Sequence, residues 1–168
     1  MKKIITISKK HNIPIVEDAC HAILAKNQNK LAGSFGSFGC FSLHPLKNLN
    51  VWGDGGFVLC SNKNLYKKIK LLRNHGLINR DKNLVFGYNS RLDTIQAIVG
   101  AHLLKKIEHI TKSRIKNAAL YDKNLSSIDE IIIPKRLSNI KQVYHIYVIR
   151  AKDRENLKVF LNSNGIDA

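Results

Sequence analysis

The chain has 168 residues, of which 44% are hydrophobic, and a formal net charge of +16 at pH 7. This length suffices for one ordinary hydrophobic core or for part of a larger fold. No apolar run is long enough to span a membrane and no signal-peptide core follows the first lysines, so we expect a cytoplasmic protein. The three cysteines argue against a disulfide framework, and the seven histidines show no zinc-binding spacing, so we expect no metal site.

The positive charge raises the question of nucleic-acid binding. The 21 lysines and 7 arginines are spread along the chain together with 17 asparagines. This distribution indicates a general composition bias, because a surface that follows phosphates would gather its charge in one stripe. A basic nucleic-acid-binding protein is therefore only a distant third candidate, and we expect no specific nucleic-acid partner and no membrane partner.

Apolar residues near the N-terminus predict a helix followed by a strand. The isoleucines within residues 4–7 are followed by the apolar run Ile13–Val16, which ends abruptly in Glu17 and Asp18. A short apolar run closed by acids is typical of a buried parallel strand with carboxylates at its C-terminal end. In open α/β sheets, ligands bind at that end.

The glycine-rich stretch from Gly33 to Gly56 contains two further predicted strands, Phe38–Ser42 and Gly56–Cys60. Asp54-Gly55 is a strong turn signal directly before the second strand. The loop over residues 43–54 is polar yet lies between buried strands. Loops of this kind often carry the chemistry of a site.

A helix is predicted over residues 62–74, with Ser61 as its N-cap and Gly76 as its stop signal. Residues 77–90 show no periodicity and predict a loop.

A second, longer helix is predicted to start at Asp93, with Gln96 at the capping-box position three residues on. A third helix, from about Lys112 to Leu125, is expected to continue from it.

The character of the sequence changes in the tail. Ile131–Pro134 and Val143–Ile149 are strand-like, and residues 153–162 are helical in pattern. We therefore expect a second, unfinished domain over residues 111–168, after a first domain over residues 1–110.

Four groups of residues stand out when they are taken in order. They are Ile13–Ala22, then Gly33–Gly36 running into Cys40–Leu49, then Trp52–Gly56, and finally Leu72–Gly76 with Gly87–Asp93. Together, at this spacing, they resemble the DegT/DnrJ/StrS family of sugar aminotransferases. The resemblance implies an α/β fold, fold type I of the pyridoxal 5'-phosphate (PLP)-dependent transferases, which is similar to aspartate aminotransferase. Residues 1–110 would then be the C-terminal part of the PLP-binding large domain, and residues 111–168 the start of the small domain.

Lys47 occupies the position of the family's cofactor-binding lysine. PLP chemistry needs a lysine that bonds to the cofactor and then moves a proton between substrate and cofactor carbons. Outside this motif, Lys47 would be one surface lysine among 21. Within it, the resemblance implies the catalytic role.

Asp18 matches the family carboxylate that faces the pyridine nitrogen of PLP and keeps it protonated. Because side chains alternate along a strand, Glu17 is expected to point the other way. The alternative for Asp18 is that it only caps the segment that follows.

The resemblance implies three more cofactor-binding residues. His21 would lie near the cofactor ring and its phenolic oxygen, and Ser42 would help to hold the phosphate. Asn89 would reach the phosphate of the other subunit's cofactor, which requires at least a homodimer. Each has a structural alternative: a lone histidine, a turn serine and a loop asparagine. Arg91 and Asp93 are interpreted as a salt-linking arginine and an N-cap.

The implied reaction moves an amino group from an amino acid, with glutamate the expected donor, to the keto group of a nucleotide-linked deoxysugar. Such an activity belongs to polysaccharide biosynthesis. Family members with histidine in place of the lysine are sugar dehydratases, so Lys47 favours transamination. The resemblance begins almost at Met1, whereas family members carry a long segment before it, so we expect a fragment that is inactive alone. The alternative is a non-catalytic remnant or interaction module of the same fold.

Overall fold

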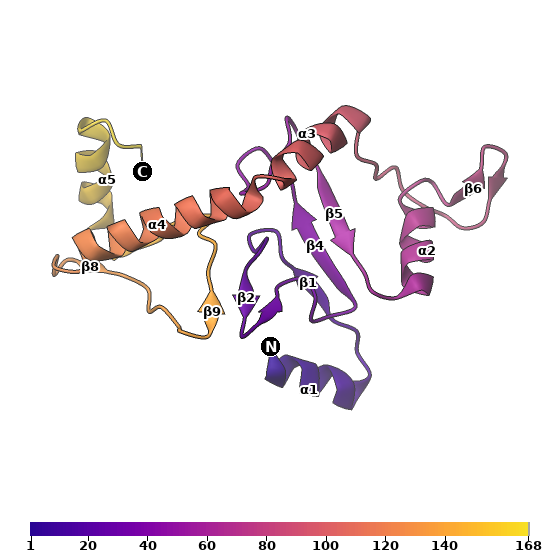
Figure 1. Cartoon of the computed structure of the whole chain (residues 1–168), viewed down its shortest axis with the longest axis horizontal. Coiled ribbons are helices and arrows are strands. Elements are labelled where there is room, and N and C mark those ends of the chain that lie inside the picture. Colours follow the sequence, from indigo (N-terminus) through magenta and orange to yellow (C-terminus); the bar gives the residue numbers. More distant parts are fainter. Residues whose placement is uncertain (168) are drawn as a thin grey trace.

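Three strands form a small sheet at the centre of the computed structural model, which describes residues 1–167 (Figure 1). They are β1 (Val16–Asp18), β4 (Phe38–Ser42) and β5 (Gly56–Leu59), in the order β1–β4–β5. β1 is parallel to β4, with Asp18 opposite Cys40, and β5 is antiparallel to β4. The two strands predicted in the glycine-rich stretch are thus confirmed, the second to within one residue.

The first predicted strand is parallel as expected, but its position and burial are wrong. The strand is formed by Val16–Asp18 and not by Ile13–Val16, and Ile13 and Val16 are 61% and 60% exposed. β1 lies at the edge of the sheet, so one of its sides has no strand partner among residues 1–167. Glu17 and Asp18 are therefore part of the strand, and its pairing with β4 fixes their directions.

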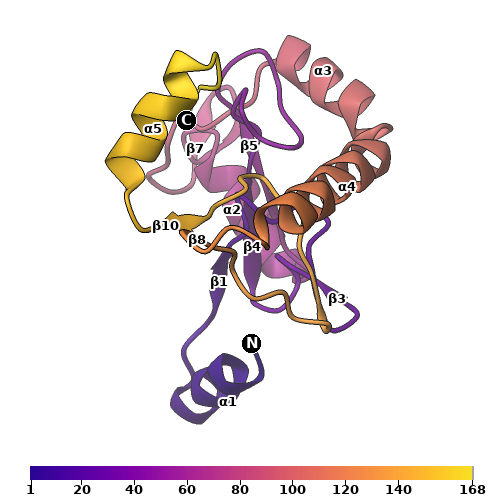
Figure 2. The ribbon, with the colours of Figure 1, turned by 90° about the vertical axis from the view of Figure 1, so that its left-hand side faces the viewer.

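The helix expected near the N-terminus is α1 (Lys2–His11). It ends at Asn12, which adopts a left-handed conformation with φ 51°, a conformation that asparagine tolerates better than most residues. Basic residues occupy its last turn, where the negative end of the helix dipole favours them. Figure 2 shows that α1 stands away from the sheet.

The next helix, α2 (Lys63–Leu72), is capped by Asn62 and not by Ser61 as predicted. The Asn62 Oδ1 accepts hydrogen bonds from the backbone N–H groups of Asn64 (2.9 Å) and Leu65 (3.0 Å). Asparagine and serine are both good N-caps, and the capping residue is the one whose side chain reaches the second and third N–H groups.

Gly76 lies just beyond α2 with φ +73°, and a Cβ at this position would meet the Val85 carbonyl oxygen at 1.7 Å. Glycine is required here on both counts. The segment that follows is a short hairpin of β6 (Leu77–Asn79) and β7 (Lys82–Asn83), where a loop without strands was predicted.

Two helices follow, α3 (Thr94–Leu104) and α4 (Ile107–Leu125). α3 begins after Asp93 as predicted, but the capping box does not form. The Gln96 Oε1 instead accepts a hydrogen bond from the backbone N–H of Trp52 at 2.7 Å, which ties the helix to the loop after β4. α4 begins several residues earlier than predicted and is separated from α3 by two lysines.

The buried core lies between that loop and these two helices. Four apolar residues form it, and partly buried neighbours surround it: Leu43, Leu49, Val51 and Ile107, with Ile23, Leu24, Phe57, Leu92 and Leu103 around them. Gly100 allows α3 to approach, because a Cβ there would lie 3.3 Å from Val51 Cγ1. Each such side chain contributes about 1.5–3 kcal/mol when fully buried, so the loop after β4 is held firmly in place.

The tail returns to the N-terminal half of the chain. The two-stranded hairpin of β2 and β3 gains a third strand, β9, from the tail, and β8 pairs with β10 before the last helix. Their bounds are β2 (Lys26–Asn27), β3 (Lys30–Leu31), β8 (Ile131–Ile132), β9 (Ile140–Lys141), β10 (Arg150–Ala151) and α5 (Arg154–Ser163). The predicted helix over residues 153–162 is confirmed to within one residue.

Residues 143–149 do not form the predicted strand. Tyr144 has φ 49°, which breaks an extended backbone, and the first three carbonyls of this segment accept hydrogen bonds from side chains. Asn48 donates its Nδ2 hydrogen to Val143 O at 2.9 Å, and Arg114 donates to the carbonyls of Tyr144 and His145. Tertiary hydrogen bonds have replaced a sheet ladder here.

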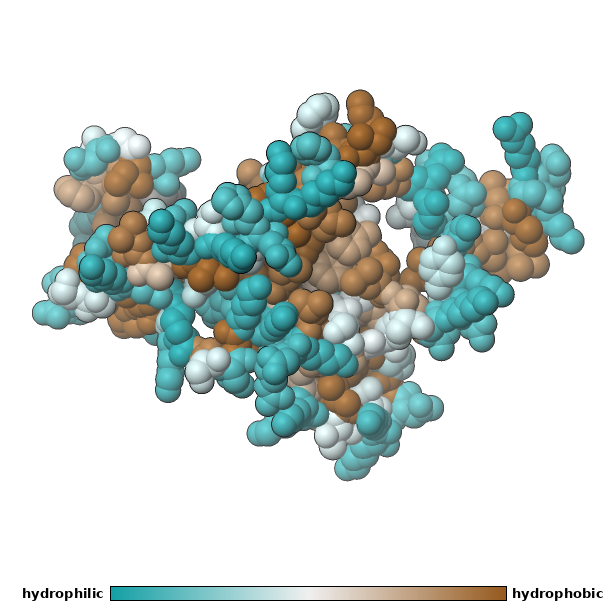
Figure 3. All heavy atoms as spheres, in the orientation of Figure 1, coloured by the Kyte–Doolittle hydropathy of each residue, from teal (hydrophilic) through white to brown (hydrophobic). Residues whose placement is uncertain are grey.

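Apolar side chains remain exposed on the outer surface of α3 and near the β6–β7 hairpin (Figure 3). Ile95 and Ile98 are 59% and 63% exposed, and Phe86 is fully exposed. Within the part of the chain that the structure describes, no helix is both long enough and apolar enough to cross a membrane.

Candidate active site

The end of β1 presents two carboxylates to opposite faces of the sheet. The Glu17 carboxylate accepts hydrogen bonds from the backbone N–H groups of Gly33 (2.9 Å) and Gly36 (2.7 Å), and so holds the glycine-rich turn before β4. The Asp18 carboxylate accepts a hydrogen bond from the backbone N–H of Cys20 at 3.1 Å. The predicted alternation is confirmed: Glu17 has a structural partner and Asp18 faces the other side.

Asp18 is kept ionised by its neighbours. The Cys20 thiol and backbone N–H beside it hold the pKa of the Asp18 carboxyl below its usual value, and the nearby His21 and Lys47 act in the same direction. The same contact raises the pKa of the Cys20 thiol, which makes this cysteine a poor nucleophile at neutral pH. Asp18 is therefore an anion next to two groups that can carry positive charge.

Lys47 lies in the turn after β4, and the core holds this turn in place. Its backbone N–H donates to His44 O at 2.8 Å, and the next residue, Asn48, is buried and bonded to the tail. The Lys47 Nζ lies 3.5 Å from Nε2 of His145. Within residues 1–167, the two ion pairs are Arg136–Asp122 and Arg154–Glu155, so no carboxylate there forms an ion pair with the Lys47 amine.

His21 follows β1 by three residues and packs against the tail. Its ring centroid lies 4.3 Å from that of His145, with the planes tilted by 50°. Burial lowers the pKa of His145, and the proximity of His21, Lys47 and Arg114 lowers it further. His145 is therefore neutral at pH 7. The sequence prediction missed it, because it lies in a run whose apolar pattern indicated only a strand.

Ser42 is the last residue of β4 and lies five residues before Lys47. Its Oγ accepts a hydrogen bond from the backbone N–H of His44 at 3.2 Å. A hydroxyl that accepts one hydrogen bond can still donate its own hydrogen, for example to a phosphate oxygen. The structure thus places Ser42 at the start of the turn that carries Lys47.

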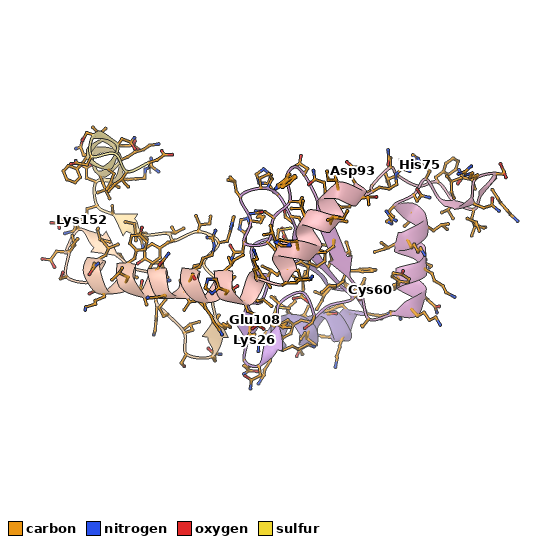
Figure 4. All side chains as sticks on the ribbon, turned by 45° about the horizontal axis from the view of Figure 1, so that its top comes forward. Lys26, Cys60, His75, Asp93, Glu108 and Lys152 are labelled. Atoms are coloured by element: carbon orange, nitrogen blue, oxygen red, sulfur yellow. The ribbon has the colours of Figure 1, made fainter. Side chains whose placement is uncertain are left out.

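Asn89 is not brought together with the other predicted residues. It is exposed, its Oδ1 accepts a hydrogen bond from Arg91 Nε at 3.0 Å, and its backbone bridges to Asn74. Figure 4 labels His75 and Asp93 on either side of this segment in the sequence, and the segment lies near α2, on the opposite side of the sheet from the tail. Arg91 bonds to amide oxygens, which corrects the expected salt link, and Asp93 caps α3 without a side-chain hydrogen bond.

A cavity of about 360 Å³ opens beside His21 and His145. Its tail wall includes Arg136, which bonds to the Asp122 carboxylate and lies over the ring of Tyr147 at 5.5 Å. The Tyr147 hydroxyl donates to Asp122 Oδ1 at 2.7 Å, and burial together with this bond raises the pKa of Tyr147 to about 12. This wall is a braced structural element beside the site.

These residues fit the chemistry of PLP. An amine without a carboxylate partner can bond to an aldehyde, and an ionised carboxylate can pair with a protonated pyridine nitrogen. The Nδ1 of His145, beside Lys47, is buried and has no hydrogen-bond partner in residues 1–167. Lys47, Asp18 and His21 thus lie close together, with Ser42 at the start of the turn that carries Lys47, whereas Asn89 lies apart from them.

The chain is similar to known proteins over almost its whole length. The chain is 36% identical over 168 residues to a pleiotropic regulatory protein of Geobacillus stearothermophilus. It is 34% identical over 166 residues to the UDP-N-acetyl-3-dehydro-alpha-D-glucosamine 3-aminotransferase of Acidithiobacillus ferrooxidans. Each match covers 99% of this chain and 45% of the relative.

Among solved structures, S. venezuelae DesV in complex with a ketimine intermediate matches with a TM-score of 0.95 at 32% identity, over 99% of this chain and 45% of DesV. The predicted fold class is confirmed: the chain has the α/β fold of the PLP-dependent sugar aminotransferases. It spans a little under half the length of these relatives.

The family match runs over residues 1–168 and includes every motif named above. The chain belongs to the DegT/DnrJ/EryC1/StrS aminotransferase family.

Proposed function

We propose that this protein is a PLP-dependent aminotransferase that moves an amino group from an amino acid, glutamate, to the keto group of a nucleotide-linked deoxysugar. The observation that carries the proposal is the Lys47 amine, which has a neutral imidazole beside it and the ionised Asp18 nearby. The relative from Acidithiobacillus ferrooxidans, a 3-aminotransferase of a UDP-linked sugar, supports the substrate class.

Each predicted residue then has a role. Lys47 would bond to the cofactor and carry the proton at its Nζ, Asp18 would face the pyridine nitrogen, and His21 would lie near the phenolic oxygen. Ser42 would donate to the phosphate. The bound cofactor would supply an electron sink for the carbon next to the amino group.

Asn89 is the residue from which we infer a homodimer. Because it is exposed and lies apart from Lys47, it would serve the cofactor phosphate of a second subunit in a homodimer. The exposed apolar residues around Phe86 and Ile95 are compatible with such a contact. We further propose a cytoplasmic location, and a division near residue 110 between the large-domain part and the small-domain part.

PLP binding tests the function. Residues 1–168 expressed alone should be poorly soluble or self-associated and should bind PLP weakly, because exposed apolar residues and open strand edges need cover. Co-expression with the preceding segment of the Geobacillus relative should restore solubility and give the yellow absorbance of lysine-bound PLP. We call this co-expressed pair the complemented protein.

Two outcomes of this experiment would contradict the proposal or its prediction for residues 1–168. A soluble complemented protein without yellow colour would favour the alternative, a non-catalytic module of the same fold. A monodisperse, yellow and active protein made from residues 1–168 alone would refute the prediction that they are inactive by themselves.

A further inference from the structure

The imidazole of His145 lies between two residues of the proposed site. Its Nε2 is 3.5 Å from Nζ of Lys47, and its ring is tilted against that of His21 at a centroid distance of 4.3 Å. Its Nδ1 is buried and finds no hydrogen-bond partner among residues 1–167. In the part of the chain that the structure describes, the imidazole therefore directs its one polar contact at the Lys47 amine.

Three hydrogen bonds from two side chains hold the backbone that carries His145. Arg114 of α4 donates hydrogen bonds to the carbonyls of Tyr144 (3.1 Å) and His145 (3.2 Å), and Asn48 donates to Val143 O. Tyr144 adopts φ 49°, a conformation that is unfavourable for a residue with a large side chain. Residues that surrounding contacts hold in an unfavourable backbone conformation cluster at functional sites.

The link through Asn48 joins both partners to one anchor. Asn48 is adjacent to Lys47 in the chain and is only 5% exposed, and its side chain bonds to a carbonyl two residues before His145. A shift of the tail would therefore move the lysine loop as well. The amine and the imidazole are positioned as a pair.

We propose that His145 is a positioning residue for Lys47: its imidazole Nε2 accepts a hydrogen bond from the Lys47 amine and holds that amine beside Asp18 and His21. The inference rests on the proposed function only in naming PLP as the group that Lys47 meets. The contact itself belongs to this chain.

The protonation state of the imidazole follows from its surroundings. The groups that face it are His21 from the turn after β1, Lys47 from the loop after β4 and Arg114 from α4. Each disfavours a second positive charge, and so does burial, so the ring is neutral. A lysine ammonium is a donor only, hence Nε2 must be the acceptor and the ring hydrogen must be on Nδ1.

Nitrogen-15 NMR of the histidine rings in the cofactor-free complemented protein tests this directly. We expect His145 in the wild type to carry its hydrogen on Nδ1 at pH 7. In the Lys47→Met variant, the hydrogen should move to Nε2, the tautomer that an unconstrained imidazole prefers. A hydrogen on Nε2 in both proteins would overturn the proposal.

Chemical reactivity of the amine gives a second readout that needs no bound cofactor. In His145→Phe, which keeps a ring but loses the acceptor, acetic anhydride should acetylate Lys47 about fivefold faster, the factor expected when one ordinary hydrogen bond is lost. His145→Gln, whose amide oxygen can accept, should restore the slower rate. Lys152, which Figure 4 shows near the end of α4 away from Glu108, is the internal control.

The outcomes separate the proposal from the function it deepens. Equal Lys47 rates in wild type and a folded His145→Phe would show that the ring only fills space, which overturns the proposal. The NMR comparison decides the matter if that variant does not fold. Failure to bind PLP with the Lys47–His145 coupling intact would reject the proposed function and leave this inference standing.

Discussion

Two irregular segments carry predicted site residues, and they are fixed in different ways. Residues 43–51, which include Lys47, bury Leu43, Leu49 and Val51 in the core at 2–4% exposure. Residues 84–89, which lead to Asn89, leave Phe86 fully exposed and Tyr88 74% exposed. Both segments contain several apolar residues and lack regular secondary structure, so these features do not distinguish them.

The difference shows what fixes an irregular backbone. In the Lys47 segment, apolar side chains enter the core, and Asn48 ties the loop to the tail. In the Asn89 segment, backbone hydrogen bonds join the chain to the end of α2, such as that from the Tyr88 N–H to Leu72 O at 2.7 Å, while the large side chains stay exposed. A buried core therefore fixes the first segment. Backbone hydrogen bonds fix the second, and its exposed side chains are available to another surface, such as that of the proposed partner subunit.

The largest effect on activity should come from the segment that carries Lys47. Lys47→Ala in the complemented protein should abolish both the yellow absorbance of lysine-bound PLP and turnover. Lys47→Arg should fail as well, because a guanidinium keeps the charge but cannot bond to the aldehyde. Spectra and activity are measured on the same preparations, and normal turnover in Lys47→Ala would remove the residue from its role.

Asp18→Asn should leave PLP bound but slow transamination about a hundredfold or more, since the amide cannot hold the pyridine nitrogen protonated. The pKa of Asp18 is lowered in the folded protein, so its carboxylate contributes stability that is fully present above the ordinary pKa of an aspartate. This contribution to stability is lost as the pH falls through the lowered, folded-state pKa. Single-turnover kinetics measure the step. An unchanged rate in a well-expressed variant would leave Asp18 without this role.

The link between the lysine loop and the tail can be broken at Asn48. Asn48→Ala should lower the free energy of unfolding by about 1–3 kcal/mol, because Val143 O loses its partner in a buried place. Denaturant unfolding measures it, with the exposed Asn64→Ala as a control expected to change stability by less than about 0.5 kcal/mol. Equal effects in both variants would mean that the loop is not anchored through Asn48.

The tail itself can be tested by alkaline titration. Because the pKa of Tyr147 is raised to about 12, its phenol should ionise only in strongly alkaline solution. The unfolded state ionises near pH 10, so the stability from this tyrosine is complete below pH 10 and is lost as the pH rises toward 12. Ultraviolet absorbance follows the titration, and Tyr147→Phe should remove the component that ionises near pH 12. A curve that is identical in the variant would contradict this.

The smallest change in stability is expected in the segment that carries Asn89. Asn89→Ala should alter the free energy of unfolding by less than about 0.5 kcal/mol, because the side chain is exposed and its contacts are local. Under the homodimer proposal, the same variant should weaken PLP binding in the dimer. A mixed dimer that carries Lys47→Ala in one subunit and Asn89→Ala in the other separates contacts within a subunit from those across it. Unaltered PLP affinity would count against Asn89 as a phosphate ligand.

Much of the local structure followed from the sequence alone. The strands Phe38–Ser42 and Gly56–Leu59, the start of α3 after Asp93 and the C-terminal helix α5 were predicted closely, because turn, cap and periodicity signals act over a few residues. The opposite directions of Glu17 and Asp18 followed from the alternation along a strand. The motifs around Lys47 also indicated the family.

Contacts between distant segments decided the rest. Gln96 was expected to cap its own helix, yet its side chain accepts a hydrogen bond from the backbone N–H of Trp52. Residues 143–149 were expected to form a strand, yet Asn48 and Arg114 donate hydrogen bonds to the first three of their carbonyls. His145 has no local signal, because its meeting with Lys47 joins residues 98 positions apart. Periodicity and capping patterns report only on neighbours in the chain. The partner of a buried polar group is chosen among all groups that folding brings within reach, so the tertiary structure alone reveals it.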